Sequence, residues 1–160
     1  VKDKYTLIKS VLKGKKVFLV EDSIVRGTTT AGIVQRLKRE GRAKEVHVRV
    51  SCPPIRYPCF YGIDMSTLGE LIAPRHSSYE LLDIGSKEVT EKETSAIAKE
   101  IGADSVIYQP IKGLVRAIGF RENELCLACL NGRYPTKCGK ALLCRAVQNF
   151  KKGKGKRTYE

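Results

Sequence analysis

The sequence predicts an α/β fold in which a parallel sheet is flanked by helices. Residues 16–20 form a short apolar run, and residues 46–50 alternate valines with polar side chains, so both segments are typical of strands. Between them, residues 28–40 place apolar side chains on one face of a helix, which Gly41 ends. Strand, helix and strand in this order form a βαβ unit, whose strands are parallel and joined by a right-handed crossover.

Three further segments extend this pattern toward the carboxyl terminus. Residues 90–101 are predicted to be a helix, in which Thr90 and Glu93 have the spacing of a capping box. Residues 105–108 follow as a short strand, and residues 111–118 as an amphipathic helix. Only three strands result, whereas sheets usually have about four to six. We therefore expect either a partner that supplies more sheet or the carboxyl-terminal portion of a larger domain.

The formal charge of +13 is concentrated near the carboxyl terminus. Residues 137–160 contain eight Lys or Arg residues and one acidic residue, and residues 151–157 include no apolar side chain. We therefore expect residues 137–160 to form a basic, disordered tail. Such a tail can touch nucleic acid through phosphate charge, but few aromatic residues are interleaved with the charges, so nucleic acid is not expected as a partner.

No apolar run approaches the roughly 20 residues that a membrane-spanning helix needs. Residues 1–5 also lack the hydrophobic stretch of a signal peptide. These observations predict a cytoplasmic location and no membrane partner. Because thiols stay reduced in that compartment, the six cysteines are not expected to form disulfides.

The segment from Val17 to Thr29, with the sequence VFLVEDSIVRGTT, has the composition of a ligand site. It runs from a strand, through the acidic pair Glu21 and Asp22, into a small glycine-containing loop that opens a helix. Backbone N–H groups and the helix dipole favour an anion at such a place, and the loop suits a phosphate monoester. Two carboxylates beside a phosphate imply sugar hydroxyls and Mg²⁺ between them. The motifs of P-loop NTPases and of dinucleotide-binding folds are both missing from the sequence.

This segment resembles the phosphoribosylpyrophosphate (PRPP) fingerprint of the type I phosphoribosyltransferases, and most closely that of the amidophosphoribosyltransferase family. Residues 45–50, 53–64, 101–105 and 126–136 resemble the same family in the same order. The resemblance implies that residues 1–136 are the carboxyl-terminal part of a phosphoribosyltransferase domain, that is, a partial type I phosphoribosyltransferase fold with a cysteine-containing segment at its carboxyl-terminal end.

The family catalyses the first step of purine (IMP) biosynthesis, in which ammonia derived from glutamine displaces pyrophosphate from PRPP to give 5-phosphoribosylamine. By resemblance, Glu21 and Asp22 would hold the ribose hydroxyls and Mg²⁺, although the family more often has Asp at the first of these positions. The PRPP-binding residues would be Glu21, Asp22, Ser23, Ile24, Val25, Arg26, Gly27, Thr28 and Thr29. No catalytic residue is assigned.

The glutaminase domain of the family and the first half of its transferase domain have no counterpart in the sequence. We therefore expect a subunit, a truncated product or a fragment that is inactive alone. It would work as a homo-oligomer or with a partner subunit that carries the missing parts. The alternative is a non-catalytic PRPP-binding regulatory module, associated with nucleic acid through its basic tail.

Many members of the family also bind a structural [4Fe-4S] cluster through four cysteines. Cys59, Cys126 and Cys129 match three of these ligands, and the fourth is not identified, although Cys138 or Cys144 are candidates. Thiolates are the ligands that such clusters require. Two other interpretations stay open: Zn²⁺ bound by Cys126, Cys129, Cys138 and Cys144, or reduced thiols without a metal.

Overall fold

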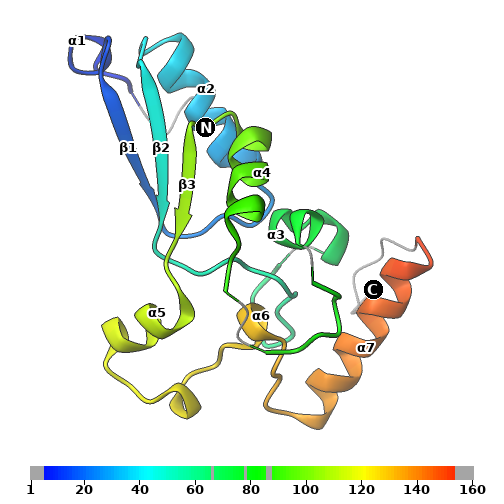
Figure 1. The fold of residues 1–160 in the computed structure, drawn as a ribbon. Coiled ribbons are helices and arrows are strands. Elements are labelled where there is room, and N and C mark those ends of the chain that lie inside the picture. The colour runs from blue at the N-terminus through cyan, green and yellow to red at the C-terminus, as the bar shows by residue number, and fades with distance from the viewer. Residues whose placement is uncertain (1–5, 66, 78, 86–87, 154–160) are drawn as a thin grey trace.

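The computed structural model contains the parallel sheet that the sequence predicts (Figure 1). It describes residues 6–65, 67–77, 79–85 and 88–153. The elements in chain order are α1 (Lys9–Leu12), β1 (Lys16–Glu21), α2 (Thr28–Arg39), β2 (Glu45–Val50), the 3₁₀ helix η1 (Leu68–Glu70), α3 (Ile72–His76), α4 (Glu91–Ile101), β3 (Ser105–Tyr108), α5 (Ile111–Ile118), the 3₁₀ helix η2 (Glu122–Glu124), α6 (Ala128–Asn131) and α7 (Lys137–Lys151). The described part of the chain has no helix of the length and apolarity that crossing a membrane requires.

The three strands are parallel and lie in the order β1-β2-β3. Helices α2 and α4 lie on the same side of this sheet (Figure 1). Their apolar faces bury the valines of β2, and Val46 and Val48 are fully buried. Each such side chain contributes roughly 1.5–3 kcal/mol through burial. The predicted strands and the predicted helices of this layer are therefore confirmed.

Helix α4 begins and ends as the sequence predicts. Thr90 accepts a hydrogen bond from the backbone N–H of Glu93, and the Glu93 carboxylate accepts one from the backbone N–H of Thr90. Gly102 ends the helix in the left-handed conformation, at φ +75°. This capping box satisfies backbone donors that a helix start otherwise leaves unpaired.

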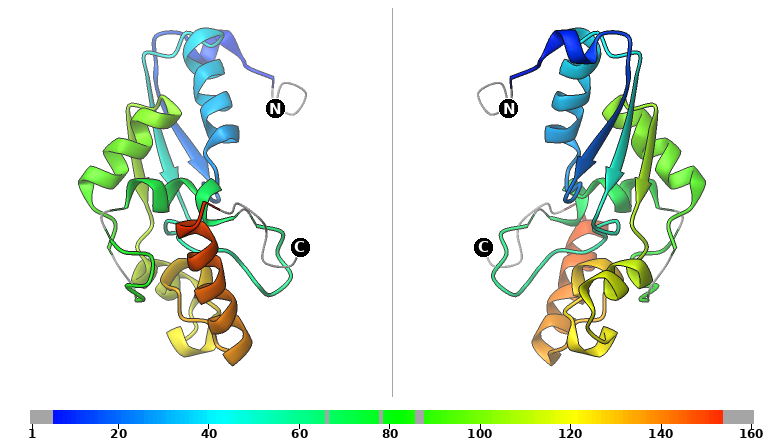
Figure 2. Two further views of the ribbon diagram at one scale, coloured as in Figure 1. Left: turned by 90° about the vertical axis from the view of Figure 1, so that its right-hand side faces the viewer. Right: turned by 90° about the vertical axis from the view of Figure 1, so that its left-hand side faces the viewer.

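A second apolar cluster lies beyond the carboxyl ends of the strands, where α5, α6 and α7 gather (Figures 1 and 2). The prediction of a disordered tail from residue 137 is wrong for residues 137–151, which form α7. Gly139, Leu143, Ala146 and Val147 are buried along one side of this helix. Their spacing of three or four residues gives α7 an apolar stripe that the count of positive charges obscured. Residues 154–160 of the predicted tail lie outside the described residues.

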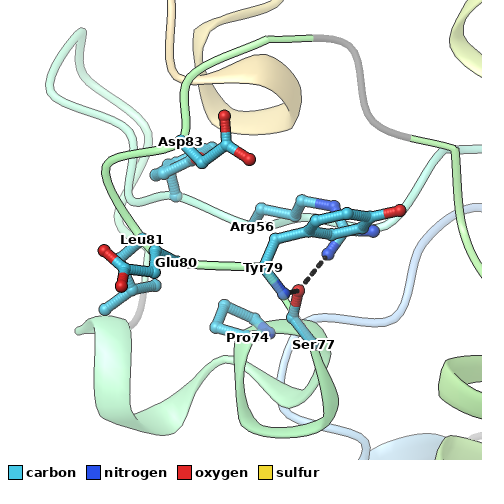
Figure 3. A pocket seen from close by; sticks show the side chains of 8 residues that line it. Arg56, Pro74, Ser77, Tyr79, Glu80, Leu81 and Asp83 are labelled. Atoms are coloured by element: carbon cyan, nitrogen blue, oxygen red, sulfur yellow. Dashed lines mark hydrogen bonds between the residues drawn. The ribbon is translucent and has the colours of Figure 1, made fainter.

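Arg56 attaches the proline-rich loop, residues 52–59, to α4. This loop follows β2. The Arg56 guanidinium donates to the Glu93 carboxylate at 2.9 and 3.4 Å and to the Ser77 hydroxyl at 3.0 Å. Figure 3 shows this group beside the ring of Tyr79, at the edge of a cavity of about 10 Å³. Burial raises the pKa of Glu93, but the hydrogen bonds from Arg56 and Thr90 outweigh it, so the pKa lies below its ordinary value. Because a buried charge without its partner is costly, Arg56 and Glu93 depend on each other.

Gly27 is the N-cap of α2, and only glycine suits this position. Its φ is +87°, in the left-handed region that other residues rarely adopt. An added Cβ would lie 2.6 Å from Cδ1 of Ile72 and 3.2 Å from Cγ2 of Ile101. The loop before α2 therefore packs directly against α3 and α4, with no room for a side chain.

We predict that Gly27→Ala destabilises the protein more than Gly102→Ala does. Both glycines have a positive φ, so each alanine carries backbone strain of roughly 1–2 kcal/mol. Only Gly27 has crowded surroundings, which add roughly 1–3 kcal/mol, whereas a Cβ at Gly102 meets nothing within 4 Å. Urea unfolding of the two variants measures the difference. Equal losses of unfolding free energy would show that the contact with Ile72 imposes no constraint.

Candidate functional site

A cleft of about 660 Å³ lies where β1 ends and α2 begins. Ligands of open parallel α/β sheets bind at this location, outside the carboxyl ends of the strands. The residues that line the cleft are Glu21, Asp22, Ser23, Val25, Arg26, Gly27, Thr28, Thr29, Thr30, Ile55, Ile63, Asp64 and Met65. Eight of the nine predicted PRPP-binding residues are among them.

The exception is Ile24, whose side chain is 2% exposed and belongs to the core of the sheet layer. Its side chain does not line the cleft, so the prediction that Ile24 binds PRPP stays a prediction and concerns its backbone. Ile24 instead packs into the core of the sheet layer and so holds the loop against it.

The acidic pair is held by the neighbouring strand. The backbone N–H and the hydroxyl of Ser51 both donate to the backbone carbonyl of Glu21 at 3.0 Å. The backbone N–H of Cys52 donates to the carbonyl of Asp22 at 2.9 Å. The β1–β2 ladder therefore continues past the last strand residue and fixes the backbone from which both carboxylates project.

One oxygen of the acidic pair has no protein partner. Oε1 of Glu21 is buried and accepts no hydrogen bond from the described residues. Burial, and to a smaller extent the charge of Asp22, raises the pKa of Glu21. A buried carboxylate oxygen without a donor is costly, so this position favours a ligand that brings a hydroxyl group or a cation.

The start of α2 presents backbone donors to the same cleft. No side chain caps this helix, and its first turn contains no acidic residue. The first N–H groups of a helix have no partner within it, and the helix dipole places partial positive charge there. Thr28 and Thr29 also line the cleft, and each carries a hydroxyl group. An anion is therefore favoured beside this turn, a short distance along the cleft from the carboxylates.

Arg26 lies between this cleft and a second cavity of about 390 Å³. Its guanidinium is 3.5 Å from a carboxylate oxygen of Glu70, in an ion pair whose two members are largely exposed. Exposed pairs of this kind contribute little to stability, about 0–1 kcal/mol. The side chain of Arg26 is therefore not committed to the fold and remains usable by a ligand.

One wall of the cleft was not predicted from the sequence. Ile55 belongs to the proline-rich loop, and Ile63, Asp64 and Met65 follow it. These residues are more than 25 positions from the loop between Ser23 and Thr29, so local patterns do not reveal the contact. Pro53, Pro54 and Pro58 are one signal in the sequence, because prolines favour irregular loops and such loops often carry sites.

The predicted cluster ligands share one neighbourhood but form no metal site in the described part of the chain. Burial, and then the thiols of Cys52, Cys59 and Cys126, raises the pKa of Cys129 to about 11. No group of three or more His, Cys, Asp or Glu side chains there could hold a metal ion. The described residues on their own therefore do not present a complete ligand set for a cluster. The same holds for the zinc alternative, since Cys138 and Cys144 are exposed on α7.

Comparisons with known proteins agree with the motifs. No family model matches the chain. An amidophosphoribosyltransferase of Methanocaldococcus jannaschii is 50% identical over 137 residues, which are 86% of this chain and 25% of the relative. The amidophosphoribosyltransferase of Bacillus subtilis is 45% identical over 141 residues, 86% of this chain and 26% of the relative.

The fold agrees as well. The solved structure of glutamine PRPP amidotransferase from B. subtilis, complexed with ADP and GMP, superposes with a TM-score of 0.65 and 42% identity. The match covers 85% of this chain and 28% of that chain. The chain spans about a quarter of the length of these relatives. By sequence and by fold it is homologous to a segment of the amidophosphoribosyltransferases, and the resemblance that its motifs predicted is confirmed.

Proposed function

We propose that this chain is the PRPP-binding part of an amidophosphoribosyltransferase, the enzyme that forms 5-phosphoribosylamine and pyrophosphate from PRPP and ammonia derived from glutamine. One observation carries the proposal. An acidic pair with one buried, unpartnered carboxylate oxygen and an uncapped helix start line the same cleft. A phosphorylated ribose fits both features, because its hydroxyls donate to carboxylates and its phosphate accepts from N–H groups.

In this proposal the loop from Ser23 to Thr29 holds the 5′-phosphate, while Glu21 and Asp22 accept from the ribose hydroxyls. The acidic pair also suits Mg²⁺, which is usually bound by one or two carboxylates together with substrate phosphates. The unpartnered Oε1 of Glu21 fits such a cation. When bound, Mg²⁺ would neutralise the charge that builds up on the departing pyrophosphate. The chain itself would contribute positioning of the ribose and phosphate.

We propose further that the chain does not release pyrophosphate alone, because about three quarters of its relatives' length has no counterpart here. It would act within a homo-oligomer or together with the parts of the enzyme that it does not match. We propose that Cys59, Cys126 and Cys129 are three ligands of a [4Fe-4S] cluster in that assembly. This proposal is supported by the fact that the thiols of Cys59 and Cys126 both lie close enough to Cys129 to raise its pKa. A cytoplasmic location stays a prediction from the sequence.

Titration calorimetry with Mg²⁺ and PRPP tests the binding site. Glu21→Gln and Asp22→Asn should each weaken binding by at least about tenfold, since each removes a charge-assisted contact. Glu122→Gln, an exposed acid outside the cleft, serves as the matched control and should bind as the unchanged chain does. Equal affinity of all four proteins, or binding without Mg²⁺ dependence, would contradict the assignment.

The same titration has an expected pH dependence. The pKa of Glu21 is raised, so this carboxylate takes up a proton at a higher pH than an ordinary glutamate. Mg²⁺-dependent binding should therefore be full above this pKa and weaken as the pH falls through it. Glu21→Gln should remove that part of the pH dependence, and a profile that the variant leaves unchanged would assign the titration to another group.

Anaerobic reconstitution with iron and sulfide tests the cysteine proposal. We expect Cys126→Ser to lower the iron bound per chain and Cys138→Ser to leave it unchanged. In this proposal Cys138, which is exposed on α7, is not the fourth cluster ligand that the sequence left open, and it would bind metal only in the zinc alternative. Iron content that depends on neither cysteine would contradict a cluster, and zinc that is lost in both variants would favour the alternative.

A further inference from the structure

Helix α7 presents an exposed face whose only charges are positive. The opposite side of the helix is apolar and packs into the second apolar cluster through residues such as Leu143 and Val147. The exposed basic residues recur along the whole helix and share one face of it at 3.6 residues per turn. We call these residues the basic face: Lys137, Lys140, Arg145 and Lys151. Packing therefore uses the apolar side of α7 and leaves the basic face in solvent.

No acidic side chain of this region balances the charge. Residues 125–153 contain six Lys or Arg residues and no Asp or Glu, so their formal charge is +6. None of the basic-face residues forms an ion pair with another described residue, whereas such pairs occur elsewhere, as between Lys38 and Asp104 at 2.9 Å. Like charges three or four positions apart on a helix also repel each other, as Lys137 and Lys140 do. A ligand with several negative charges would relieve this repulsion.

The uncharged residues of the same face indicate which anion it suits. Ala141, Cys144 and Gln148 lie between the cations, and none of them is a large apolar side chain. Protein interfaces usually have an apolar core that includes aromatic residues. A helix on a membrane surface inserts its apolar side, which α7 has already buried. The phosphate backbone of a nucleic acid needs only cations, so it fits this face best.

The length of α7 sets the size of the ligand. The helix has 15 residues, which gives a length of about 22 Å at a rise of about 1.5 Å per residue. A stacked strand advances about 3.4 Å per nucleotide, so the helix runs beside about six phosphates. Figures 1 and 2 show α7 at the edge of the molecule, where a strand can lie along it.

We propose that the basic face of α7 binds the phosphate backbone of a nucleic acid strand without reading its sequence. Nucleic acid was not expected from the sequence, because few aromatic residues are interleaved with the charges. Aromatic side chains stack on bases, but contacts with phosphates need none. The structure changes the expectation because residues 137–151 form a helix that places the cations on one face. The basic face is separate from the PRPP cleft, since no residue of α7 lines that cleft.

Fluorescence anisotropy tests the proposal with a labelled single-stranded RNA of about 20 nucleotides, titrated at several salt concentrations. The triple variant Lys137→Gln, Lys140→Gln, Arg145→Gln should bind at least about tenfold more weakly at about 0.1 M salt. It should also reduce the slope of log affinity against log salt by roughly 2, because each lost contact with a single strand removes about 0.7. A DNA duplex of the same length, measured in parallel, shows which form of the backbone binds more tightly.

The matched control replaces Lys9, Lys13 and Lys15 by Gln. These exposed residues belong to α1 and the turn after it, at the other end of the molecule from α7 (Figure 1). Both triple variants lose three positive charges, so they differ only in where the charge is lost. Charges at this separation are screened by salt, so the control should keep the affinity and the salt slope of the unchanged chain.

The outcomes are distinct. Selective loss of binding in the α7 variant supports the proposal. Absence of binding to both nucleic acids by the unchanged chain overturns it, and so does equal loss in the two triple variants, which would assign binding to net charge. Binding only to vesicles of anionic lipid overturns it in favour of a membrane. Thermal melting checks the fold, and Lys151→Gln alone, which should lower the slope by about 0.7, decides if the triple variant does not fold. Mg²⁺-dependent PRPP binding should stay unchanged in the α7 variants, so this test is independent of the proposed function.

Discussion

The close contact of Gly27 with Ile72 and Ile101 is the constraint on which the rest of the structure depends. At this point the loop after β1, helix α3 and the end of α4 meet, with no space for a Cβ. The backbone N–H of Ile72 also donates to the carbonyl of Val25 at 2.9 Å, which ties α3 to the same loop. Because the loop cannot shift outward, α2 starts at a fixed place, and its free N–H groups face the cleft instead of a neighbouring side chain.

The position of the acidic pair depends on contacts with the residues that follow β2. Hydrogen bonds from Ser51 and Cys52 fix the backbone of Glu21 and Asp22, and the loop that follows Cys52 returns to line the cleft with Ile55. That loop is held in turn by the ion pair of Arg56 with Glu93, whose side chains are 8% and 3% exposed. The proposed binding site for a sugar phosphate thus rests on one glycine, one backbone ladder and one buried ion pair. In each of these contacts at least one partner, such as Ile72, Ser51 or Arg56, does not line the cleft.

The sequence predicted the parts that depend on local patterns. Local patterns predicted the described strands and the longer helices of the sheet layer: alternating valines, the apolar face of α2 and the capping box at Thr90. The order of acids, glycine and threonines predicted the position of the cleft. Contacts between distant segments were not visible in this way. Ile63 and Asp64 come to line the same cleft as the loop only after the chain has folded. Helix α7 was not predicted because its apolar stripe lies among many basic residues. The side chain of Ile24 turned inward because the core needs it, which a motif does not encode.

The central claim is that the uncapped start of α2 holds the 5′-phosphate. Amide chemical shifts in the NMR spectrum of the labelled chain test it most directly when ribose 5-phosphate is titrated in the presence of Mg²⁺. Direct hydrogen bonds to a phosphate move the shifts of the donating N–H groups most, so the account predicts the largest changes at Gly27, Thr28 and Thr29. Unchanged shifts at these three residues, with saturable changes elsewhere in the chain, would contradict it.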